Sequence, residues 1–420
     1  MEVLVIGYVW PEPSSSAAGS RMVQLLEFFI STGATVTFAT TATPTPWIFD
    51  IEGMGISTTQ IELNNPSFDV FLENLKPGIV VFDRFMMEEQ FGWRVNKTCP
   101  DALKVLDTED LHFLRNFREL EFKGKAGKEA FATSNLAKRE IASIYRCDLS
   151  LIISEAEMKL LTSEFNIPPS IIFYLPFLFR DITPVDIADL PGFDDRRNFI
   201  SIGNFRHAPN VDAVIYLKKE IWPLIHEEIP DAKMEVYGAY PSARIEKLRD
   251  PKTNFIIKGR ANDAAQVVQN ARVSLAPIRF GAGLKGKLTE AMICGTPTVT
   301  TTTGAEGMNG NMDWNGFIKD DPAGFAKAAV LLYNNEDRWC EAQENGFKII
   351  NSRFTSALFY EKFLGRLQEI LNDLVAHRNS NFIGAMLMHH RMKSTYFLSK
   401  YIEVKTALEK SKMPKKTDHP

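Results

Sequence analysis

The chain has 420 residues, of which 45% are hydrophobic and 24% charged, ordinary values for a soluble globular protein. These values exclude a disordered chain, a collagen-like chain and a small disulfide scaffold, and the length predicts two domains. Lys and Arg number 48 against 52 Asp and Glu, for a net charge of −4. The overall charge therefore gives no indication of a nucleic-acid partner, and any bound anion needs a local site.

The cysteines and the N-terminus predict a cytoplasmic protein. The four cysteines are far apart and form no CxxC pair, as is typical of buried thiols in a reducing compartment. The N-terminal apolar run has Glu2 where a secretion signal carries positive charge, and it stops at Pro11. No stretch reaches the roughly 20 apolar residues that a membrane span needs.

Strand and helix patterns alternate through the first 180 residues. The run VLVIGYV at 3–9 is the continuous apolar pattern of a parallel strand that is buried on both faces. A helical pattern and a second strand follow, which together predict a βαβ unit. The predicted strands are 3–9, 34–40, 78–83, 103–107 and 149–154, and the predicted helices are 21–31, 65–75 and 120–145.

The alternation stops at 181–195, an acidic segment with two prolines that we interpret as a linker. It then resumes with predicted strands 198–203, 233–238, 253–259, 272–278 and 296–302 and predicted helices 212–225, 264–270 and 284–294. The chain is thus predicted to be an α/β protein with Rossmann-like, parallel-sheet domains at 1–180 and 196–354 that face across a cleft. Ligands of such sheets bind at the carboxyl ends of the strands.

The glycine-rich stretch PIRFGAGLKGKLTE at 277–290 carries the densest chemical signal. Lys285 and Lys287 fall in the first turn of a predicted helix, where cations oppose the helix dipole. An anion bound in the glycine loop, flanked by these lysines and Arg279, removes the conflict, and a phosphate or diphosphate is the natural candidate. The alternative is a solvated lysine pair, with Lys287 bridging Glu290 on the same helix.

The same loop also fits a dinucleotide fingerprint. Residues 281–286 read GxGxxG, and Glu306 lies twenty residues beyond Gly286, where a nicotinamide enzyme places its ribose-binding acid. That fingerprint usually opens its domain, whereas this one comes late in the second sheet. Both interpretations put a nucleotide diphosphate on the same helix.

The stretch GAGLKGKLTEAMICGTPTVTTTTGAEGM at 281–308 resembles the donor-site segment of family 4 (group 1) glycosyltransferases, which have the GT-B fold. The resemblance extends to SIGNFRHAPNVDAV (201–214), DTEDLHFLR (107–115) and the N-terminal stretch up to Arg21. It implies a nucleotide-sugar donor, transfer with retention of anomeric configuration, and no required metal or cofactor. It also implies that a helix at 355–376 crosses back to the first domain.

The resemblance implies a set of donor-binding residues. Glu290 matches the glutamate that holds the donor ribose hydroxyls, and a carboxylate that accepts from two vicinal hydroxyls makes strong bonds. Lys285 or Lys287 would neutralise the diphosphate, and Arg206 would face the same phosphates. The neighbouring His207 and Asn210 could touch the donor, although a turn explains them equally well. Gly19 would let the N-terminal loop approach the substrates closely.

One position departs from the family pattern. Ala282 stands where the family often has a second glutamate that contacts the sugar. We therefore expect the sugar to be held otherwise, through the backbone N–H groups of Gly283 and Leu284. In the first domain, His112 matches a histidine that faces the transferred sugar, and with Asp110 and Lys287 it forms the predicted catalytic set. The alternative makes this segment a helix start capped by Thr108.

The leading hypothesis is a retaining glycosyltransferase that moves a hexose-type sugar to a glycan or lipid-linked acceptor in cell-envelope polysaccharide synthesis. A non-catalytic nucleotide-sugar-binding protein, motivated by Ala282, and a nicotinamide oxidoreductase remain alternatives. The basic tail at 377–420 suits either peripheral contact with the inner membrane or a helical hairpin packed on the first domain, because its apolar residues show no clean stripe in the sequence.

Overall fold

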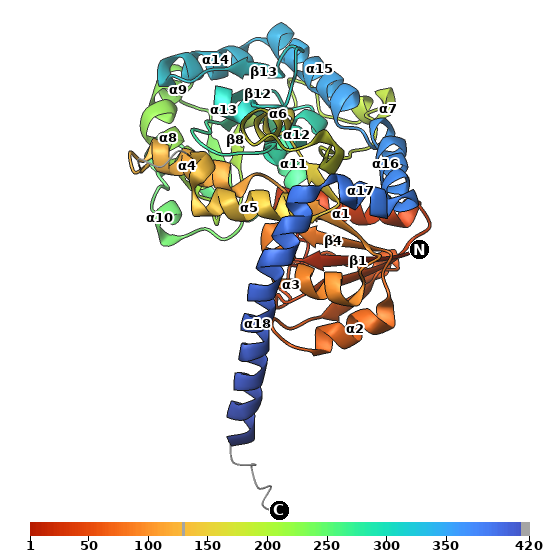
Figure 1. Ribbon diagram of the computed structural model, residues 1–420. Helices are drawn as coiled ribbons and strands as arrows, with labels where there is room; N and C mark the ends of the chain where they lie inside the picture. Colours follow the sequence, from red (N-terminus) through yellow and green to blue (C-terminus); the bar gives the residue numbers. More distant parts are fainter. Residues whose placement is uncertain (128–130, 413–420) are drawn as a thin grey trace, which may run out of the picture.

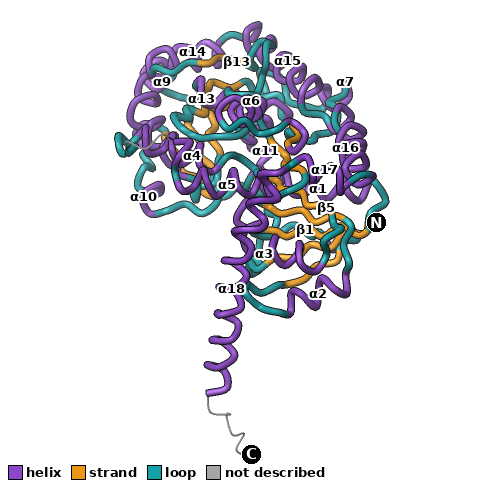
Figure 2. The backbone as a smooth tube through the Cα atoms, in the orientation of Figure 1, coloured by secondary structure: helices purple, strands orange, loops and turns teal. Residues whose placement is uncertain are grey.

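Two parallel β-sheets, each with helices on both faces, form the two halves of the protein (Figures 1 and 2). The computed structural model describes residues 1–127 and 131–412, without the side chains of 390–393 and 410–412. The basic residues Arg391, Lys393, Lys410, Lys412, Lys415 and Lys416 of the predicted tail therefore lie outside the described side chains.

The first sheet has the strand order β3-β2-β1-β4-β5-β6-β7, and the pairs are parallel. Its strands are β1 Glu2–Gly7, β2 Thr35–Thr40, β3 Ser57–Gln60, β4 Ile79–Asp83, β5 Leu103–Asp107, β6 Leu149–Ile152 and β7 Ile172–Tyr174. Its helices are α1 Ala17–Ser31, α2 Ser67–Leu75, α3 Phe85–Thr98, α4 His112–Phe122, α5 Asn135–Arg146 and α6 Glu155–Glu164.

The continuous apolar run in β1 fills both helix layers. Leu4 and Ile6 pack into the core that includes residues of α2, α3 and α5, whereas Val3 and Val5 pack on the opposite face against α1. This alternation is the reason that a buried parallel strand has no polar side.

The second sheet has the strand order β10-β9-β8-β11-β12-β13 and is again parallel. Its strands are β8 Arg197–Ile202, β9 Met234–Tyr237, β10 Phe255–Gly259, β11 Ala271–Ala276, β12 Thr298–Thr300 and β13 Gly316–Ile318. Its helices are α8 Ala208–Tyr216, α9 Trp222–Glu228, α10 Ala243–Glu246, α11 Ala264–Gln269, α12 Gly286–Ile293, α13 Thr302–Ala305, α14 Pro322–Asn334 and α15 Glu336–Arg353. The predicted linker contains a short helix, α7 Pro184–Ala188.

Two predicted helices were wrong in extent. The predicted helix 120–145 is the end of α4 and the whole of α5, and the segment between them contains Gly124 with φ of 65° and Gly127. The predicted helix 212–225 is divided into α8 and α9 by a π-helical turn at 217–221, with Pro223 in the first turn of α9. Glycine and proline interrupt regular helix hydrogen bonding, which accounts for both breaks.

The chain returns to the first domain at its C-terminal end. Helix α16, Tyr360–Asn372, buries Phe363, Leu367 and Ile370 in the same core as β1 and α1. The ring of Phe363 lies 4.5 Å from that of Phe28 in α1, which fixes the crossing point. Two helices follow, α17 Leu374–Ser380 and α18 Phe382–Lys412, and the far end of α18 projects from the body (Figure 1).

The base of α18 is fastened to the first domain by polar contacts. Just before it, Arg378 donates to both carboxylate oxygens of Asp148, at 2.8 and 2.9 Å. Further along, Arg94 of α3 pairs with Glu403 and donates to the hydroxyl of Ser399 at 3.1 Å. Within residues 1–127 and 131–412, no helix combines the length and the apolar content of a membrane-crossing segment.

Hydrogen bonds and close contacts join the two domains. Arg118 of α4 donates to the Glu306 carboxylate at 2.6 and 2.8 Å, and Arg353 of α15 pairs with Glu155 of α6 at 2.6 Å. A Cβ atom on Gly286 would lie only 2.5 Å from the Cβ of Ala17, so the start of α12 packs directly on the start of α1. These contacts hold the two domains directly against each other beside the cleft.

Candidate functional site

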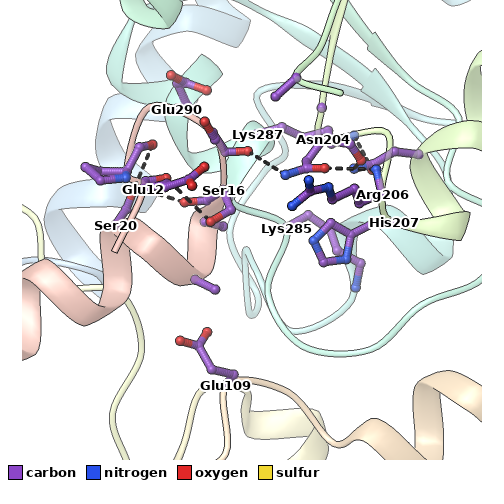
Figure 3. A pocket seen from close by; sticks show the side chains of 18 of the residues that line it. Glu12, Ser16, Ser20, Glu109, Asn204, Arg206, His207, Lys285, Lys287 and Glu290 are labelled. Atoms are coloured by element: carbon purple, nitrogen blue, oxygen red, sulfur yellow. Dashed lines mark hydrogen bonds between the residues drawn. The ribbon is translucent and has the colours of Figure 1, made fainter. Parts of the chain in front are cut away.

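A cavity of about 1070 Å³ lies between the two domains (Figure 3). Its walls come from the loops after β1, β4 and β5 in the first domain and after β8, β9, β10 and β11 in the second. In each sheet the strand order reverses beside the first strand, at β1/β4 and at β8/β11. These are the points where the loops on the carboxyl side diverge and open sheets bind ligands.

Lys287 points along the second-domain wall of this cavity toward the loop after β8 and the start of α8. Its Nζ donates to Oδ1 of Asn210 at 2.7 Å, and a Cβ atom on Gly203 would come within 2.8 Å of the same Nζ. Burial lowers the pKa of Lys287 to about 8, against the opposing effect of the Glu290 carboxylate. The predicted Lys287–Glu290 side-chain bridge is thus replaced by a bond to α8, which leaves the ammonium group at the cavity wall.

Lys285 is held by its own loop. Its Nζ donates to the backbone oxygens of Gly283 at 2.7 Å and Ala282 at 3.3 Å. Burial lowers its pKa, while the carboxylates of Glu306 and Glu157 act to raise it. Both lysines line the cavity, but Lys285 bonds to its own loop whereas Lys287 bonds to Asn210 of the neighbouring helix α8.

Glu290 lines the cavity one helical turn beyond Lys287. Burial raises the pKa of its carboxyl to about 7, with the negative charge of Asp263 adding to the effect and Lys287 opposing it. A carboxyl group so placed changes charge near neutral pH, within reach of whatever occupies the cavity.

Two helix N-termini at the cavity are left without a side-chain cap among the described residues. The N-cap of α12 is Lys285 and that of α8 is His207, and neither side chain makes a capping bond. Lysine is also a poor N-cap residue by nature. At the start of α12 the N–H groups of Gly286 and Lys287 are therefore free to bind an anion. At the start of α8, Pro209 has no N–H and the Asn210 N–H donates to the backbone oxygen of His207 at 3.1 Å, which leaves the N–H of Ala208.

Arg206 and Asn204 extend this basic wall (Figure 3). The Arg206 guanidinium stacks on the ring of Tyr240 at 3.6 Å, and the Tyr240 hydroxyl donates to Glu12 of the first domain at 3.0 Å. Asn204 donates to the backbone oxygen of Ser15 at 3.2 Å and accepts from the Arg206 backbone N–H. The loop after β8 is thus positioned by contacts that cross the cleft.

The first domain contributes a histidine and a carboxylate. His112 lines the cavity at the start of α4, and its Nδ1 lies 3.0 Å from the backbone oxygen of Asp110, which can only accept. Nδ1 therefore carries the proton and Nε2 is the acceptor atom. Although burial acts to raise it, the Arg115 guanidinium holds the pKa of Asp110 below its ordinary value. Asp110 is therefore ionised at neutral pH.

The start of α4 differs from the predicted capping by Thr108. Thr108 donates its hydroxyl proton to the backbone oxygen of Leu151 at 2.8 Å instead. The first N–H groups of α4 are bound by Glu140 of α5, which accepts from His112 at 3.1 Å and from Phe113 at 2.9 Å. A carboxylate from another helix therefore fixes the His112 backbone, because tertiary packing brings it there.

Three residues of the cavity wall have a backbone conformation that side chains rarely adopt. Arg84, directly after β4, has φ of 71° and ψ of 158°, Glu109, two residues after β5, has φ of 63°, and Tyr240 has φ of 58°. Burial raises the pKa of Glu109 to about 8, with the neighbouring Asp107 adding to the effect. Such strain persists where the surrounding structure imposes it, and it is concentrated at functional sites.

Three of the predicted donor-binding residues lie outside the cavity lining. Arg279 pairs with Asp212 at 2.7 and 2.9 Å and lies over the Tyr216 ring, so its charge is directed away from the cavity. Gly19 allows the backbone of Glu12 to pack against α1, since a Cβ atom would lie 2.4 Å from the Glu12 carbonyl carbon. The N–H of Gly283 already donates to Glu157 at 2.9 Å and cannot bind a sugar there.

The structure also places Glu306, the acid that the dinucleotide interpretation needs, away from the candidate ligand site. Glu306 pairs with Arg118 and lies outside the cavity lining, so it is not available to a ribose in this arrangement. Among the described residues, no cluster of three or more His, Cys, Asp or Glu is arranged to hold a metal ion.

The sequence analysis missed two buried groups that shape the site. Arg21 of α1, 1% exposed, binds Asp107 at the end of β5 and donates to the backbone oxygen of Leu175 at 2.7 Å. Glu157 of α6, also 1% exposed, accepts backbone N–H groups from both domains. Both residues look like ordinary polar positions of helices in the sequence, and no local pattern distinguishes them.

Residues 196–335 match the family model of glycosyl transferases group 1. A protein of the Klebsiella pneumoniae cps region, described as an uncharacterized 44.6 kDa protein, is 25% identical over 166 residues. That match covers 38% of this chain and 43% of the relative, so it spans less than half of the relative's length.

Solved structures resemble almost the whole chain. The pneumococcal O-GlcNAc transferase GtfA, solved with UDP and GlcNAc, is 12% identical with a TM-score of 0.67, and the match covers 89% of this chain and 99% of GtfA. A mutant of S. aureus TarM, solved with fondaparinux, α-GlcNAc-glycerol and UDP, is 16% identical with a TM-score of 0.56 and covers 73% of this chain. The chain spans 58% of that TarM structure.

The topology and these comparisons agree on the architecture. Two parallel α/β sheets of seven and six strands face each other across a cavity at their reversal points. The predicted fold class is confirmed: the chain has the GT-B fold, and its second domain matches the group 1 glycosyl transferases.

Proposed function

We propose that the protein is a glycosyltransferase that moves a hexose-type sugar from a nucleoside diphosphate sugar to a hydroxyl of a glycan or lipid-linked acceptor. The transfer retains the anomeric configuration and serves synthesis of cell-envelope polysaccharide. One observation carries the proposal: the interdomain cavity has Lys287, two uncapped helix N-termini and Glu290 on one wall, and His112 with two acidic residues on the other.

The basic wall has the chemistry of a diphosphate site. The Lys287 ammonium lies at the β8/β11 reversal, between the starts of α8 and α12, where backbone N–H groups and a positive dipole end favour anions. Arg206, held over Tyr240, adds a cation at the rim. In transfer, these groups stabilise the negative charge that develops on the departing diphosphate. The proposed reaction therefore needs no metal, and activity that persists in EDTA tests this point.

Glu290 suits the ribose of the donor. Its carboxyl lines the same cavity on α12, the helix that also carries Lys287. A carboxylate that accepts from two vicinal hydroxyls makes charge-assisted bonds, which are roughly twice as strong as neutral ones. The position of Glu290 beyond the phosphate-binding end of the helix supports this role.

The first-domain wall suits the sugar and the acceptor. The Nε2 atom of His112 is an acceptor for a sugar hydroxyl, and Asp110 and Glu109 supply carboxyl groups beside it. In a retaining transfer the acceptor hydroxyl attacks from the face that the diphosphate leaves, so the two walls must be close together. Closure of the domains meets this requirement and excludes water that would hydrolyse the donor.

The comparisons support the same reaction class. The match of residues 196–335 to glycosyl transferases group 1 covers the domain that carries Lys287 and Glu290. Structurally similar proteins were solved with UDP and with GlcNAc or a GlcNAc-bearing compound, and the Klebsiella relative lies in a cps region. These properties of other proteins favour UDP as the first nucleotide to test.

Calorimetric titration of the full-length protein with UDP, GDP and NADH tests the proposal. We expect a nucleoside diphosphate to bind, Lys287→Met to weaken it, and the matching sugar nucleotide to be hydrolysed or transferred. The anomeric configuration of the product then tests retention by NMR. Binding without turnover in the presence of pooled glycan acceptors favours the non-catalytic alternative, and tight binding of NADH alone favours the oxidoreductase.

A further inference from the structure

Helix α18 exposes many large apolar side chains on the side that faces away from the protein. Eight of them are between 44% and 75% exposed, namely Phe382, Ile383, Met386, Phe397, Leu398, Tyr401, Val404 and Leu408. We call these eight residues the α18 stripe. Single exposed apolar residues are ordinary on a protein surface, but this many on one helix mark an interaction site.

The stripe lies opposite the face that packs on the first domain. Ser399, 1% exposed, and Glu403 point to Arg94 of α3, and the Tyr396 ring lies 5.3 Å from that of Trp93. With about 100° between successive residues of a helix, Ser399 is about 160° from Phe397. The α18 stripe is therefore turned outward by the same contacts that fasten the helix, and the helix carries it beyond the body (Figure 1).

The width of the stripe fits a flat surface better than a second helix. At 3.6 residues per turn, its eight positions fall within an arc of about 160° along about 39 Å of helix. A two-helix coiled coil buries a narrower seam of a and d positions. A broad apolar face therefore matches a plane better than it matches one partner helix.

The positive charges near the stripe favour a partner surface with negative charge. Lys405 follows Val404 and lies one turn beyond Tyr401, where its long stem can lie along an apolar surface while the ammonium group stays in water. The ammonium group of Lys400 pairs with Glu403 at 2.7 Å. Residues 377–420 carry nine Lys and Arg against three Asp and Glu, in a chain whose net charge is −4. This excess is confined to the segment that presents the stripe and to the residues that follow it.

We infer that α18 lies along the surface of a membrane with anionic phospholipids, with the α18 stripe among the acyl chains and Lys405 at the headgroups. Each basic residue near such a surface adds about 1 kcal/mol of attraction, and aromatic residues such as Tyr401 favour the interface between water and lipid. The sequence pattern hid the stripe because α18 also carries apolar residues, such as Leu387, that pack on the first domain. The inference does not rest on the proposed reaction.

Co-sedimentation of the full-length protein with vesicles tests the inference. Vesicles of phosphatidylglycerol and phosphatidylethanolamine are compared with pure phosphatidylcholine, at low and high salt. We expect binding to the anionic vesicles that weakens with salt. Phe397→Gln with Tyr401→Gln should reduce partitioning about tenfold or more at unchanged charge, because it removes buried apolar area.

The matched control is Thr406→Gln with Ala407→Gln, two exposed residues outside the stripe on the same turns of α18. This variant should partition within about twofold of the wild type, and circular dichroism and nucleotide titration should be alike for both variants. Sedimentation velocity without lipid tests the other occupant, a second copy of the chain. Absence of vesicle binding, equal binding by the stripe variant, or a dimer that only the stripe variant dissociates would each overturn the inference.

Discussion

Glu157 and Gly283 join the two domains through one carboxylate oxygen. The Oε1 atom of Glu157 accepts the Gly283 N–H from the second domain at 2.9 Å and the Leu111 N–H from the first at 3.0 Å. Its Oε2 atom is buried without a hydrogen-bond partner among the described residues. The glycine loop of the candidate donor site is thus fixed to the loop that carries Asp110 and His112.

This junction predicts a pH-dependent stability. Burial raises the pKa of Glu157 from 4.5 to about 8, with Asp110 adding to the effect. A raised acid pKa means that the stabilising contribution is complete below about 4.5 and is lost as the pH rises through about 8. Glu157→Gln keeps the accepting oxygen without an ionisable proton. Between pH 6 and pH 9, the melting temperature of the variant should therefore fall by less than that of the wild type.

Thermal unfolding at several pH values measures this difference. Glu164→Gln is the control, because Glu164 is an exposed carboxyl on the same helix. It should follow the wild-type curve. Equal pH slopes for wild type and Glu157→Gln would mean that this carboxyl does not titrate as the structure indicates.

The two lysines of the glycine loop should behave differently. The Nζ of Lys287 bonds to Asn210 at the cavity wall, whereas the Nζ of Lys285 is bound by its own loop. Loss of a charged hydrogen bond costs about 1.5–3 kcal/mol, so Lys287→Met should weaken binding of the nucleoside diphosphate about 10- to 100-fold. Lys285→Met should mainly lower the melting temperature, with an affinity change within about threefold. Calorimetry measures the affinity of both variants for the nucleoside diphosphate. A larger loss of affinity in Lys285→Met than in Lys287→Met would assign the diphosphate to Lys285.

Nucleotide affinity should be highest at slightly alkaline pH. Glu290, with its pKa raised by burial to about 7, accepts best from ribose hydroxyls when ionised, so affinity should rise through that range. Burial lowers the pKa of Lys287 to about 8, so its ammonium group loses its charge above that pH and the affinity should fall there. Titrations at a series of pH values measure both limbs. Glu290→Gln should remove the difference between acidic and neutral pH, and an unchanged acidic limb in that variant would contradict the assignment.

Glu109 should contribute to the reaction and not to the fold. Its φ of 63° is unfavourable for a side chain and natural for glycine. Glu109→Gly should therefore keep or raise the melting temperature. We expect transfer to fall about 100-fold, as for loss of a positioned acid or base, with nucleotide affinity within about twofold. A variant that transfers sugar like the wild type would show that the strain has no role in the reaction.

Arg279 tests the corrected part of the site. Because its guanidinium pairs with Asp212 outside the cavity, Arg279→Gln should leave nucleotide affinity within about twofold. The partly exposed ion pair should contribute at most about 1 kcal/mol to stability. Calorimetry and thermal unfolding of this variant and of Asp212→Asn give the two quantities. A tenfold loss of affinity in Arg279→Gln alone would restore the sequence-based assignment.

The sequence predicted the two-sheet architecture because parallel strands have local signatures. The runs at 3–9, 78–83 and 103–107 are mostly apolar, with Lys104 as a buried exception, and the glycine loop at 281–286 ends in a helix with its lysines and Glu290 in fixed order. These features depend on neighbours a few residues apart. Short or edge elements, such as β3 with its STTQ sequence, lack that pattern and were missed.

The tertiary structure alone decided which polar groups meet. Arg21 and Asp107 are 86 positions apart in the sequence, and Glu157 and Gly283 are 126 positions apart. No local spacing therefore reveals either pair. In the sequence Arg279 looks like part of the phosphate site. In the structure its guanidinium group pairs with the Asp212 carboxylate at 2.7 Å, which neutralises its charge. Likewise, the outward direction of the α18 stripe depends on the Arg94 contacts with Ser399 and Glu403. Periodicity determines which face of an element is apolar, but only the packing of distant elements determines what that face, or a buried charge, finally touches.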